Sequence, residues 1–366
     1  MVIEEQDLKQ SKKYVKTNNE NKISYILPAK FKKTFSINNR RYLGNKYKLN
    51  KFIESVILTE CGDFESFADL FAGTGSVASI FQSKHLIVND ILYSNYVCYQ
   101  TWFGTEKYSL QKVSGFINKY NSITISKDNY MSKNYSNTYF NKENCQKIGF
   151  IREDIEQNYT NNYINHREKC ILITSLLYAI DKIANTCGHY DAYRKNGELD
   201  KKLELLIPKI NTTHFKNEIY NENINNLVKI IKADVVYLDP PYNSRQYCDA
   251  YHLLENVARW EKPKVTGVAK KMDRTQYKSE YCTINATKAF EDLISNIQAK
   301  YIVLSYNNMA NKGNDRSNAK LSDNDILRIL KSKGKVKIFS QNYKAFSTGK
   351  SNIEENAERL FVCQCF

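Results

Sequence analysis

The chain has 366 residues, which is enough for one large domain with an insertion or for two domains. Hydrophobic residues make up 42% and aromatic residues 13%, which excludes disorder over most of the length. No run approaches the about 20 apolar residues of a membrane span. Lysine and arginine total 54 against 39 acidic residues, a formal charge of +15. This charge favours a polyanionic partner, nucleic acid first, although a solubilising surface or AT-rich codons would also produce it.

The thiols and imidazoles show no metal-binding pattern. Nine cysteines are scattered without Cys-x-x-Cys spacing, and five histidines form no pair with metal-ligand spacing. The first residues, MVIEEQDLKQSKK, contain no apolar signal segment. We therefore expect reduced thiols, a cytoplasmic location, no membrane attachment and no metal.

The predicted elements begin after a polar leader. Residues 1–36 are rich in Lys and Asn and aperiodic, which predicts a flexible basic leader. Helical spacing predicts a helix over NKFIESVILTEC, ended by Gly62. SFADLFAG (66–73) then predicts a strand, GTGS a tight turn and VASIFQ a helix. LIVND (86–90) predicts a second buried strand that ends in an acid.

The alternation of strands and helices stops between residues 105 and 220. Polar segments rich in Tyr, Asn, Ser and Lys surround one strong helix there, from about His166 to Thr186, with Gly188 as its stop. We interpret 105–220 as an inserted second domain. The remaining chain, 37–104 with 221–366, is then the main domain.

After residue 221 the α/β pattern resumes. ADVVYLD, YIVLSY, KVKIFS and ERLFVCQCF read as strands, with helices near 285–298 and 323–332. Such alternation predicts an α/β fold with a parallel sheet whose ligands bind at the carboxyl ends of the strands.

A glycine-rich motif, DLFAGTGSVA (69–78), occupies the first strand-to-helix turn. Glycines permit a sharp bend and the close approach of a ligand to the backbone. The Gly-x-Gly-x-x-Ala spacing matches a dinucleotide fingerprint, with Asp90 as an acceptor for ribose hydroxyls. It fits equally well a turn that cradles S-adenosylmethionine (SAM), or a turn that serves only the fold.

The deciding motif is Asp239-Pro240-Pro241-Tyr242, which follows an apolar strand. Two prolines fix φ and remove two backbone donors, so the strand ends in a rigid loop. Hydrogen bonds from an exocyclic amine to Asp239 and to the Pro240 carbonyl would make that nitrogen more tetrahedral and more nucleophilic. Tyr242 offers a face on which a flipped base stacks. The motif therefore predicts methylation of a base amine, with an ordinary strand-end turn as the alternative.

With these motifs the sequence resembles the amino-methylating DNA methyltransferases, specifically the adenine-specific, Dam-like (D12) group that includes the type II modification methylases. The similarity covers most of residues 38–366. YLGNK (42–46) matches the family's aromatic-x-Gly-Gly-Lys motif, with Tyr for the commoner Trp and Asn for the second Gly. The order of the motifs is that of the α-group, in which target recognition lies between the glycine-rich motif and the catalytic loop. A further family acid falls near Asn221-Glu222-Asn223, where Asp is replaced.

The resemblance implies a SAM-dependent methyltransferase (Rossmann-like) fold: a seven-stranded, mostly parallel sheet with an antiparallel final strand and an inserted target-recognition domain. The implied SAM-binding residues are Tyr42, Lys46, Asp69, Phe71, Gly73, Gly75, Asp90 and Asp239. The implied catalytic residues are Asp239, Pro240 and Tyr242. The implied reaction is site-specific methylation of adenine N6 in double-stranded DNA by base flipping. A cognate restriction endonuclease would belong to the same system without a stable complex.

The segments after the catalytic loop offer DNA contacts, which we assign to Arg245, Tyr247, Lys270, Lys271 and Arg274. A packed helix and a solvated basic loop explain the same residues equally well. Three other functions stay open: amino-methylation of cytosine N4 or of adenine in RNA, a nicotinamide-dependent oxidoreductase, and an inactive DNA-binding module. The oxidoreductase leaves the Asp-Pro-Pro-Tyr motif and the charge unexplained.

Overall fold

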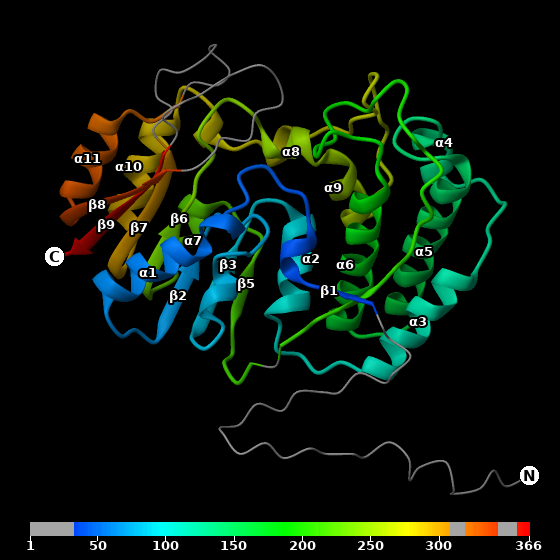
Figure 1. The fold of residues 1–366 in the computed structure, drawn as a ribbon, viewed down its shortest axis with the longest axis horizontal. Coiled ribbons are helices and arrows are strands. Elements are labelled where there is room, and N and C mark those ends of the chain that lie inside the picture. The colour runs from blue at the N-terminus through cyan, green and yellow to red at the C-terminus, as the bar shows by residue number, and fades with distance from the viewer. Residues whose placement is uncertain (1–32, 212, 308–318, 343–356) are drawn as a thin grey trace, which may run out of the picture. The chain divides into compact units, whose positions relative to one another are not determined.

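A seven-stranded sheet organises the chain in the computed structural model, which describes residues 33–211, 213–307, 319–342 and 357–366 (Figure 1). The strand order is β5-β3-β2-β6-β7-β9-β8. The bounds in that order are β5 (Glu218–Tyr220), β3 (His85–Asn89), β2 (Ser66–Asp69), β6 (Ala233–Leu238), β7 (Ala299–Asn307), β9 (Ala357–Cys365) and β8 (Gly334–Asn342). Strands from β5 to β7 pair in parallel, and β9 is antiparallel to both β7 and β8. This confirms the predicted sheet and its antiparallel final strand.

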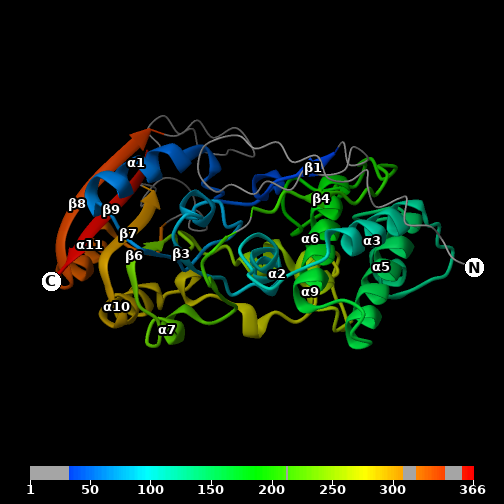
Figure 2. The same ribbon diagram turned by 90° about the horizontal axis from the view of Figure 1, so that it is seen from below.

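Helices cover both faces of the sheet. Figure 2 shows α1 (Asn50–Cys61) on one side and α7 (Ile224–Leu227), α10 (Ala286–Asn296) and α11 (Asp323–Lys331) on the other. The helix α1 ends as predicted, because Gly62 follows it with a positive φ of 63° that favours glycine. The helix predicted after the glycine-rich turn is instead a short 3-10 turn, η4 (Ala78–Phe81).

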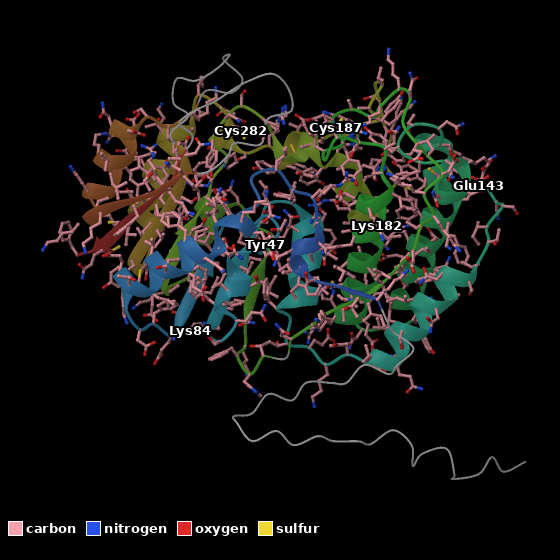
Figure 3. All side chains as sticks on the ribbon, in the orientation of Figure 1. Tyr47, Lys84, Glu143, Lys182, Cys187 and Cys282 are labelled. Atoms are coloured by element: carbon pink, nitrogen blue, oxygen red, sulfur yellow. The ribbon has the colours of Figure 1, made fainter. Side chains whose placement is uncertain are left out.

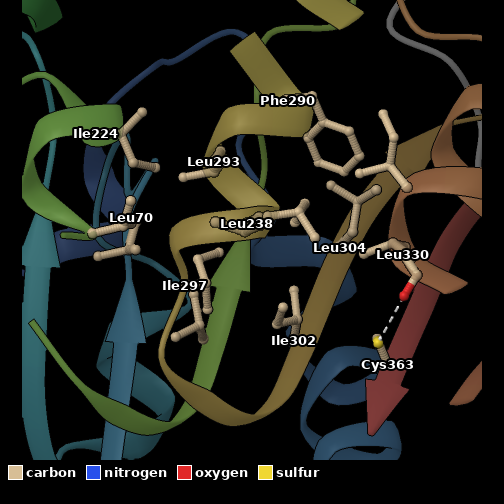
Figure 4. Close-up of a cluster of buried hydrophobic side chains, with 14 of the residues drawn as sticks. Leu70, Ile224, Leu238, Phe290, Leu293, Ile297, Ile302, Leu304, Leu330 and Cys363 are labelled. Carbon is tan, nitrogen blue, oxygen red and sulfur yellow. Dashed lines mark hydrogen bonds between the residues drawn. The ribbon is translucent and has the colours of Figure 1, made fainter. Parts of the chain in front are cut away.

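A cluster of buried apolar side chains holds α10 against the sheet. Phe290, Leu293 and Ile297 recur at helical spacing and lie beside Leu238 of β6 and Leu304 of β7 (Figure 4). Burial of each such side chain contributes roughly 1.5–3 kcal/mol. This packing fixes the end of β6, and therefore the start of the loop at Asp239.

A second group of helices lies beyond the β5 edge of the sheet (Figure 1). Its members are α2 (Tyr93–Trp102), α3 (Leu110–Ser122), α4 (Tyr130–Tyr135), α5 (Lys142–Thr160), α6 (His166–Ile183) and α9 (His252–Arg259). Nearly every residue of α6 is buried, as expected for a helix with neighbours on all sides. It contacts α2, α3, α5 and α9. The helix α6 is therefore the core of this group.

The predicted end of α6 at Thr186 is wrong by three residues. Ala184 is already extended, and the Asn185 backbone N–H donates to the Tyr139 carbonyl at 3.0 Å instead of continuing the helix. Gly188 lies in the turn that follows, with a φ of 102°.

The range 105–220 contains most of this helical group, but the group also recruits α2 and α9 from outside it. The last residues of the range 105–220 form β5 of the main sheet. Strand β4 (Ile207–Pro208), in the same range, pairs with β1 (Thr34–Phe35). The target-recognition role of 105–220 stays a prediction. Residues 1–32 of the predicted leader lie outside the described residues. The last part of the predicted leader, 33–36, is described and contains β1.

The remaining short elements are η2 (Ile37–Asn39), η3 (Tyr47–Leu49), α8 (Tyr247–Ala250), η5 (Thr275–Tyr277) and η6 (Glu280–Cys282). Within the described ranges, no helix combines the length and apolar character needed to cross a bilayer.

Candidate active site

Three acids meet at one edge of the sheet. Asp69 is the last residue of β2, Asp90 follows β3, and Asp239 follows β6. These strands are neighbours and run parallel, so their carboxyl ends lie together. All three acids line one cavity, and so do Tyr42, Lys46, Phe71 and Gly73. The structure therefore brings together residues of all three sequence motifs.

The two glycines of the turn have different surroundings. Gly73 lines the cavity with a φ of 53°, and a Cβ atom there would come within 3.0 Å of the Tyr42 ring. Gly75 is not among the cavity-lining residues. Its φ is 78°, and a Cβ atom there would meet Ile37 and Phe103 at 3.1 Å. Gly73 therefore permits close approach at the cavity, whereas Gly75 permits tight packing beneath the turn.

Asp90 joins the glycine-rich turn to β3. Its Oδ2 accepts a hydrogen bond from the Gly73 N–H at 3.0 Å, and its Oδ1 accepts one from the Leu92 N–H at 2.8 Å. Burial raises the pKa of Asp90 to about 6, against the effect of these donors. The Asn95 side chain is a third donor to this carboxylate, which has about four lone-pair sites and so keeps room to accept a ligand hydroxyl.

Asp69 is the least satisfied of the three acids. Its Oδ2 accepts a hydrogen bond from the Ala78 N–H at 3.1 Å, while Oδ1 is buried without a partner among the described residues. The side chain is 1% exposed. Burial first, and then the neighbouring carboxylates of Asp239 and Asp90, raise the pKa of Asp69 to about 8. A cationic donor in the cavity would satisfy Oδ1 and restore the charge.

Lys46 is tied to the catalytic loop. Its Nζ lies 2.9 Å from Asp239 Oδ1, donates to the Tyr242 hydroxyl, and lies 3.5 Å from Glu358 Oε1. Burial lowers the pKa of Lys46, but the two carboxylates outweigh it and the net change is upward. Burial also raises the pKa of Asp239, Lys46 opposes this rise, and Glu358 adds to it. Lys46 thus remains a cation between two acids.

Tyr242 takes part in the same network. Its hydroxyl lies 3.0 Å from Asp239 Oδ1 and 2.9 Å from Glu358 Oε1. Lys46 Nζ lies 4.9 Å from the centroid of the Tyr242 ring, and the Tyr306 ring meets that ring edge-on. Because the same Nζ donates to the phenolic hydroxyl, the ammonium group lies beyond the hydroxyl end of the ring and does not cover its face. Pro240 is buried, and Pro241 lines the cavity.

A stack of three tyrosines positions the YLGNK segment. Tyr42 stacks on Tyr251 at 4.5 Å between ring centroids and on Tyr247 at 5.4 Å. The Tyr251 hydroxyl accepts a hydrogen bond from the Leu43 N–H at 2.7 Å, and the Tyr247 hydroxyl donates to the Leu43 carbonyl at 3.2 Å. Tyr247, which we assigned to DNA, also lines the cavity.

Two of the predicted DNA-contact residues are already paired. Lys271 Nζ lies 2.9 Å from Asp191 and 3.8 Å from Asp249, and Arg274 pairs with Asp249. Lys270 has a φ of 52° in the turn before them. Arg245 is exposed, and its guanidinium makes no ion pair with the described residues.

Sequence reasoning missed two parts of the site. One part is the segment of Tyr277, Lys278 and Tyr281, which line the cavity. Cys282 follows them, is labelled in Figure 3, and donates its thiol to the Arg245 carbonyl at 3.3 Å. The other part is Glu358. No sequence motif marks either part. Glu222, from the segment where a family acid was expected, also lines the cavity.

The chain belongs to the D12 class N6 adenine-specific DNA methyltransferase family, whose model matches residues 42–313. That span contains the YLGNK segment, the glycine-rich turn and the Asp-Pro-Pro-Tyr loop. The fold and the motifs therefore define the same class.

Among the relatives, modification methylase StsI of Streptococcus sanguinis is 36% identical over 340 residues, 87% of this chain and 50% of that protein. Modification methylase LlaI of Lactococcus lactis subsp. lactis is 30% identical, with 87% and 53% covered. The chain thus spans about half the length of these two relatives. Type II methyltransferase M.NlaIII of Neisseria lactamica is 31% identical over 334 residues, 87% of this chain and 96% of that protein.

Proposed function

We propose that this chain transfers a methyl group from SAM to the N6 amine of adenine in double-stranded DNA, as the modification enzyme of a restriction-modification system. The observation that carries the proposal is the position of the Asp239 loop. It ends β6 at the cavity edge, next to the glycine-rich turn that ends β2. A methyl donor and a flipped base would therefore meet there.

The cavity residues fit SAM. The orphaned Oδ1 of Asp69 suits the donor's ammonium group, and the remaining lone pairs of Asp90 suit ribose hydroxyls. The Gly73 backbone at the cavity and the rings of Tyr42 and Phe71 suit a flat, partly apolar ligand. Bound there, SAM supplies an electrophilic methyl group on a sulfonium. Lys46 and Asp239 line the same cavity beside that donor site.

The Asp239 loop would activate the amine. Within the described residues, Lys46 and Tyr242 both contact Oδ1 of Asp239, which leaves Oδ2 for an N6 proton. The Pro240 carbonyl would accept the second N6 proton. Together these acceptors pull the nitrogen lone pair out of conjugation with the ring, and the fixed loop pays no cost of reorganisation during attack. The Asp239 carboxylate also stabilises the cationic amine until a proton leaves to solvent.

The target base needs a stacking surface outside the duplex. Lys46 lies at the hydroxyl end of Tyr242 and not over its ring, so the ammonium group would not prevent a base from stacking on that ring. Stacking on an aromatic side chain is worth about 1–3 kcal/mol, similar to the cost of flipping.

The restriction-modification assignment rests on the relatives, which are named as modification or type II methyltransferases. It implies a cognate endonuclease that cleaves the same site when the adenine is unmethylated. DNA carrying this gene's modification should then resist the endonuclease, and cleavage of fully modified DNA would contradict the assignment.

The reaction is tested by incubating the protein with labelled SAM and unmethylated duplex DNA, followed by digestion and identification of the labelled nucleoside. We expect N6-methyladenine. Label in cytosine, or no label, would overturn the proposal.

The role of Asp239 is tested by Asp239→Ala. We expect methyl transfer to be lost while SAM binding is largely retained, because Lys46 keeps its contact with Glu358 and the fold is preserved. Asp63→Ala is the matched control. Asp63 is exposed and lies just before β2 begins, at the strand end away from the cavity, and among the described residues it forms an ion pair only with Lys84. Full activity of Asp239→Ala would remove the mechanism.

A further inference from the structure

Glu358 is a buried acid that the mechanism above does not use. It is 5% exposed and is the second residue of β9. Its Oε1 accepts a hydrogen bond from Ser305 Oγ at 2.6 Å and lies 2.9 Å from the Tyr242 hydroxyl. The same oxygen lies 3.5 Å from Lys46 Nζ.

The topology brings this acid to the active site. Because β9 is antiparallel to β7, the start of β9 lies at the edge where β7 ends, and Glu358 pairs in register with Asn307. Side chains two residues apart share a face of a strand, so Glu358 lies diagonally beside Ser305. The sheet therefore adds a carboxylate to the loop from a strand more than 100 residues further along the chain.

The donors and acceptors of this network match in number. The Lys46 ammonium has three N–H groups, and its three close acceptors are Asp239, Glu358 and the Tyr242 hydroxyl. The single phenolic proton of Tyr242 can serve only one carboxylate at a time. When Glu358 accepts that proton, Asp239 keeps more of its lone pairs for a substrate amine.

We propose that Glu358 is a positioning residue for methyl transfer: it holds Lys46 and the Tyr242 hydroxyl so that the Asp239 carboxylate remains turned toward the amine. This inference rests on the proposed function. It goes further by assigning a role to a residue outside the three motifs and outside the 42–313 span of the family match.

A charge so close to Asp239 also has an electrostatic effect. The groups that face Asp239 are Lys46 from the YLGNK segment, Glu358 from β9, Asp69 from β2, and the phenols of Tyr237, Tyr242 and Tyr247. Among them, the negative charge of Glu358 raises the pKa of Asp239. Removing this charge should lower that pKa, so Asp239 would stay ionised to a lower pH.

The test compares Glu358→Gln, which removes the charge, with Glu358→Asp, which keeps it on a shorter side chain. For Glu358→Gln we expect kcat to fall roughly tenfold or more, and the acid limb of the kcat profile to move down by about one pH unit. For Glu358→Asp we expect a lower kcat with the acid limb nearly unmoved. Glu60→Gln is the control, because Glu60 pairs with Lys337 outside the site.

A second readout does not depend on activity. In protein with carbon-13-labelled aspartate carboxyls, the Asp239 signal is identified by its loss in Asp239→Ala, and its titration is compared between wild type and Glu358→Gln. A lower midpoint in Glu358→Gln supports the inference. An unmoved midpoint, or an unchanged kcat, overturns it even if the wild type methylates adenine. A wild type that does not methylate DNA would overturn the proposed function itself, and a lower midpoint would then show only the electrostatic link between Glu358 and Asp239.

Discussion

At the scale of single residues, Asp69 links stability to ligand binding. Its pKa is raised to about 8 in the folded protein, against about 3.9 in an unfolded chain. Between these values the folded state binds more protons, so the free energy of unfolding falls as pH rises through this range. Ionisation of Asp69 therefore destabilises the ligand-free fold, and under the proposed function a bound ammonium group would offset this cost.

We expect Asp69→Asn to stabilise the ligand-free protein at pH 8.5 by roughly 1–3 kcal/mol, and to have little effect near pH 4, where Asp69 is protonated. The same change should weaken SAM binding at least tenfold, because a neutral amide does not attract the ammonium group. Urea unfolding at both pH values and titration calorimetry with SAM measure the two effects. Equal stability gains at both pH values would show that the charge of Asp69 is not the cause.

At the scale of elements, the tyrosine stack joins the YLGNK segment to α8 and α9. Tyr251→Phe keeps the ring that stacks on Tyr42 but removes the acceptor of the Leu43 N–H. We expect a loss of about 1 kcal/mol in stability and a higher KM for SAM, with a smaller change in kcat. Thermal unfolding and steady-state kinetics measure these changes. Tyr163→Phe, at a side chain 60% exposed, is the control. An equal effect there would contradict the role of the Tyr251 hydroxyl in positioning the YLGNK segment.

The elements that the sequence predicts well are those with local signals. Periodicity predicts α1, α10, α11 and the parallel strands β2, β3, β6 and β7, but not the short strand β5. The Asp-Pro-Pro-Tyr motif predicts that a loop begins at Asp239. The predicted end of α6 is too late because the Asn185 N–H donates to the Tyr139 carbonyl of another segment, a contact that no local pattern indicates.

Glu358 is the clearest example of a site residue that the sequence does not predict. Its place beside Lys46 depends on the insertion of β9 between β7 and β8 and on the register of Asn307 with Glu358. Strand order and register are set by packing between distant segments, so a single sequence without an alignment does not reveal them.

At the scale of the whole molecule, the charge of +15 predicts electrostatic binding to DNA. The cations that carry this charge differ in whether they are already paired with an acid. Lys271 and Arg274 face Asp191 and Asp249, so these two cations are balanced by two anions and would have to exchange partners to bind phosphate. Arg245 follows the Asp-Pro-Pro-Tyr loop, is exposed and makes no ion pair with the described residues.

We therefore expect Arg245→Ala to weaken binding to duplex DNA more than Lys271→Ala does. The logarithm of the binding constant should fall linearly with the logarithm of salt concentration, and loss of one phosphate contact reduces the slope by about 0.9. Fluorescence anisotropy across a salt series measures both the affinity and the slope. A slope reduced in Lys271→Ala and unchanged in Arg245→Ala would show that the pair with Asp191 opens when DNA binds, and would place the phosphate on the basic loop instead.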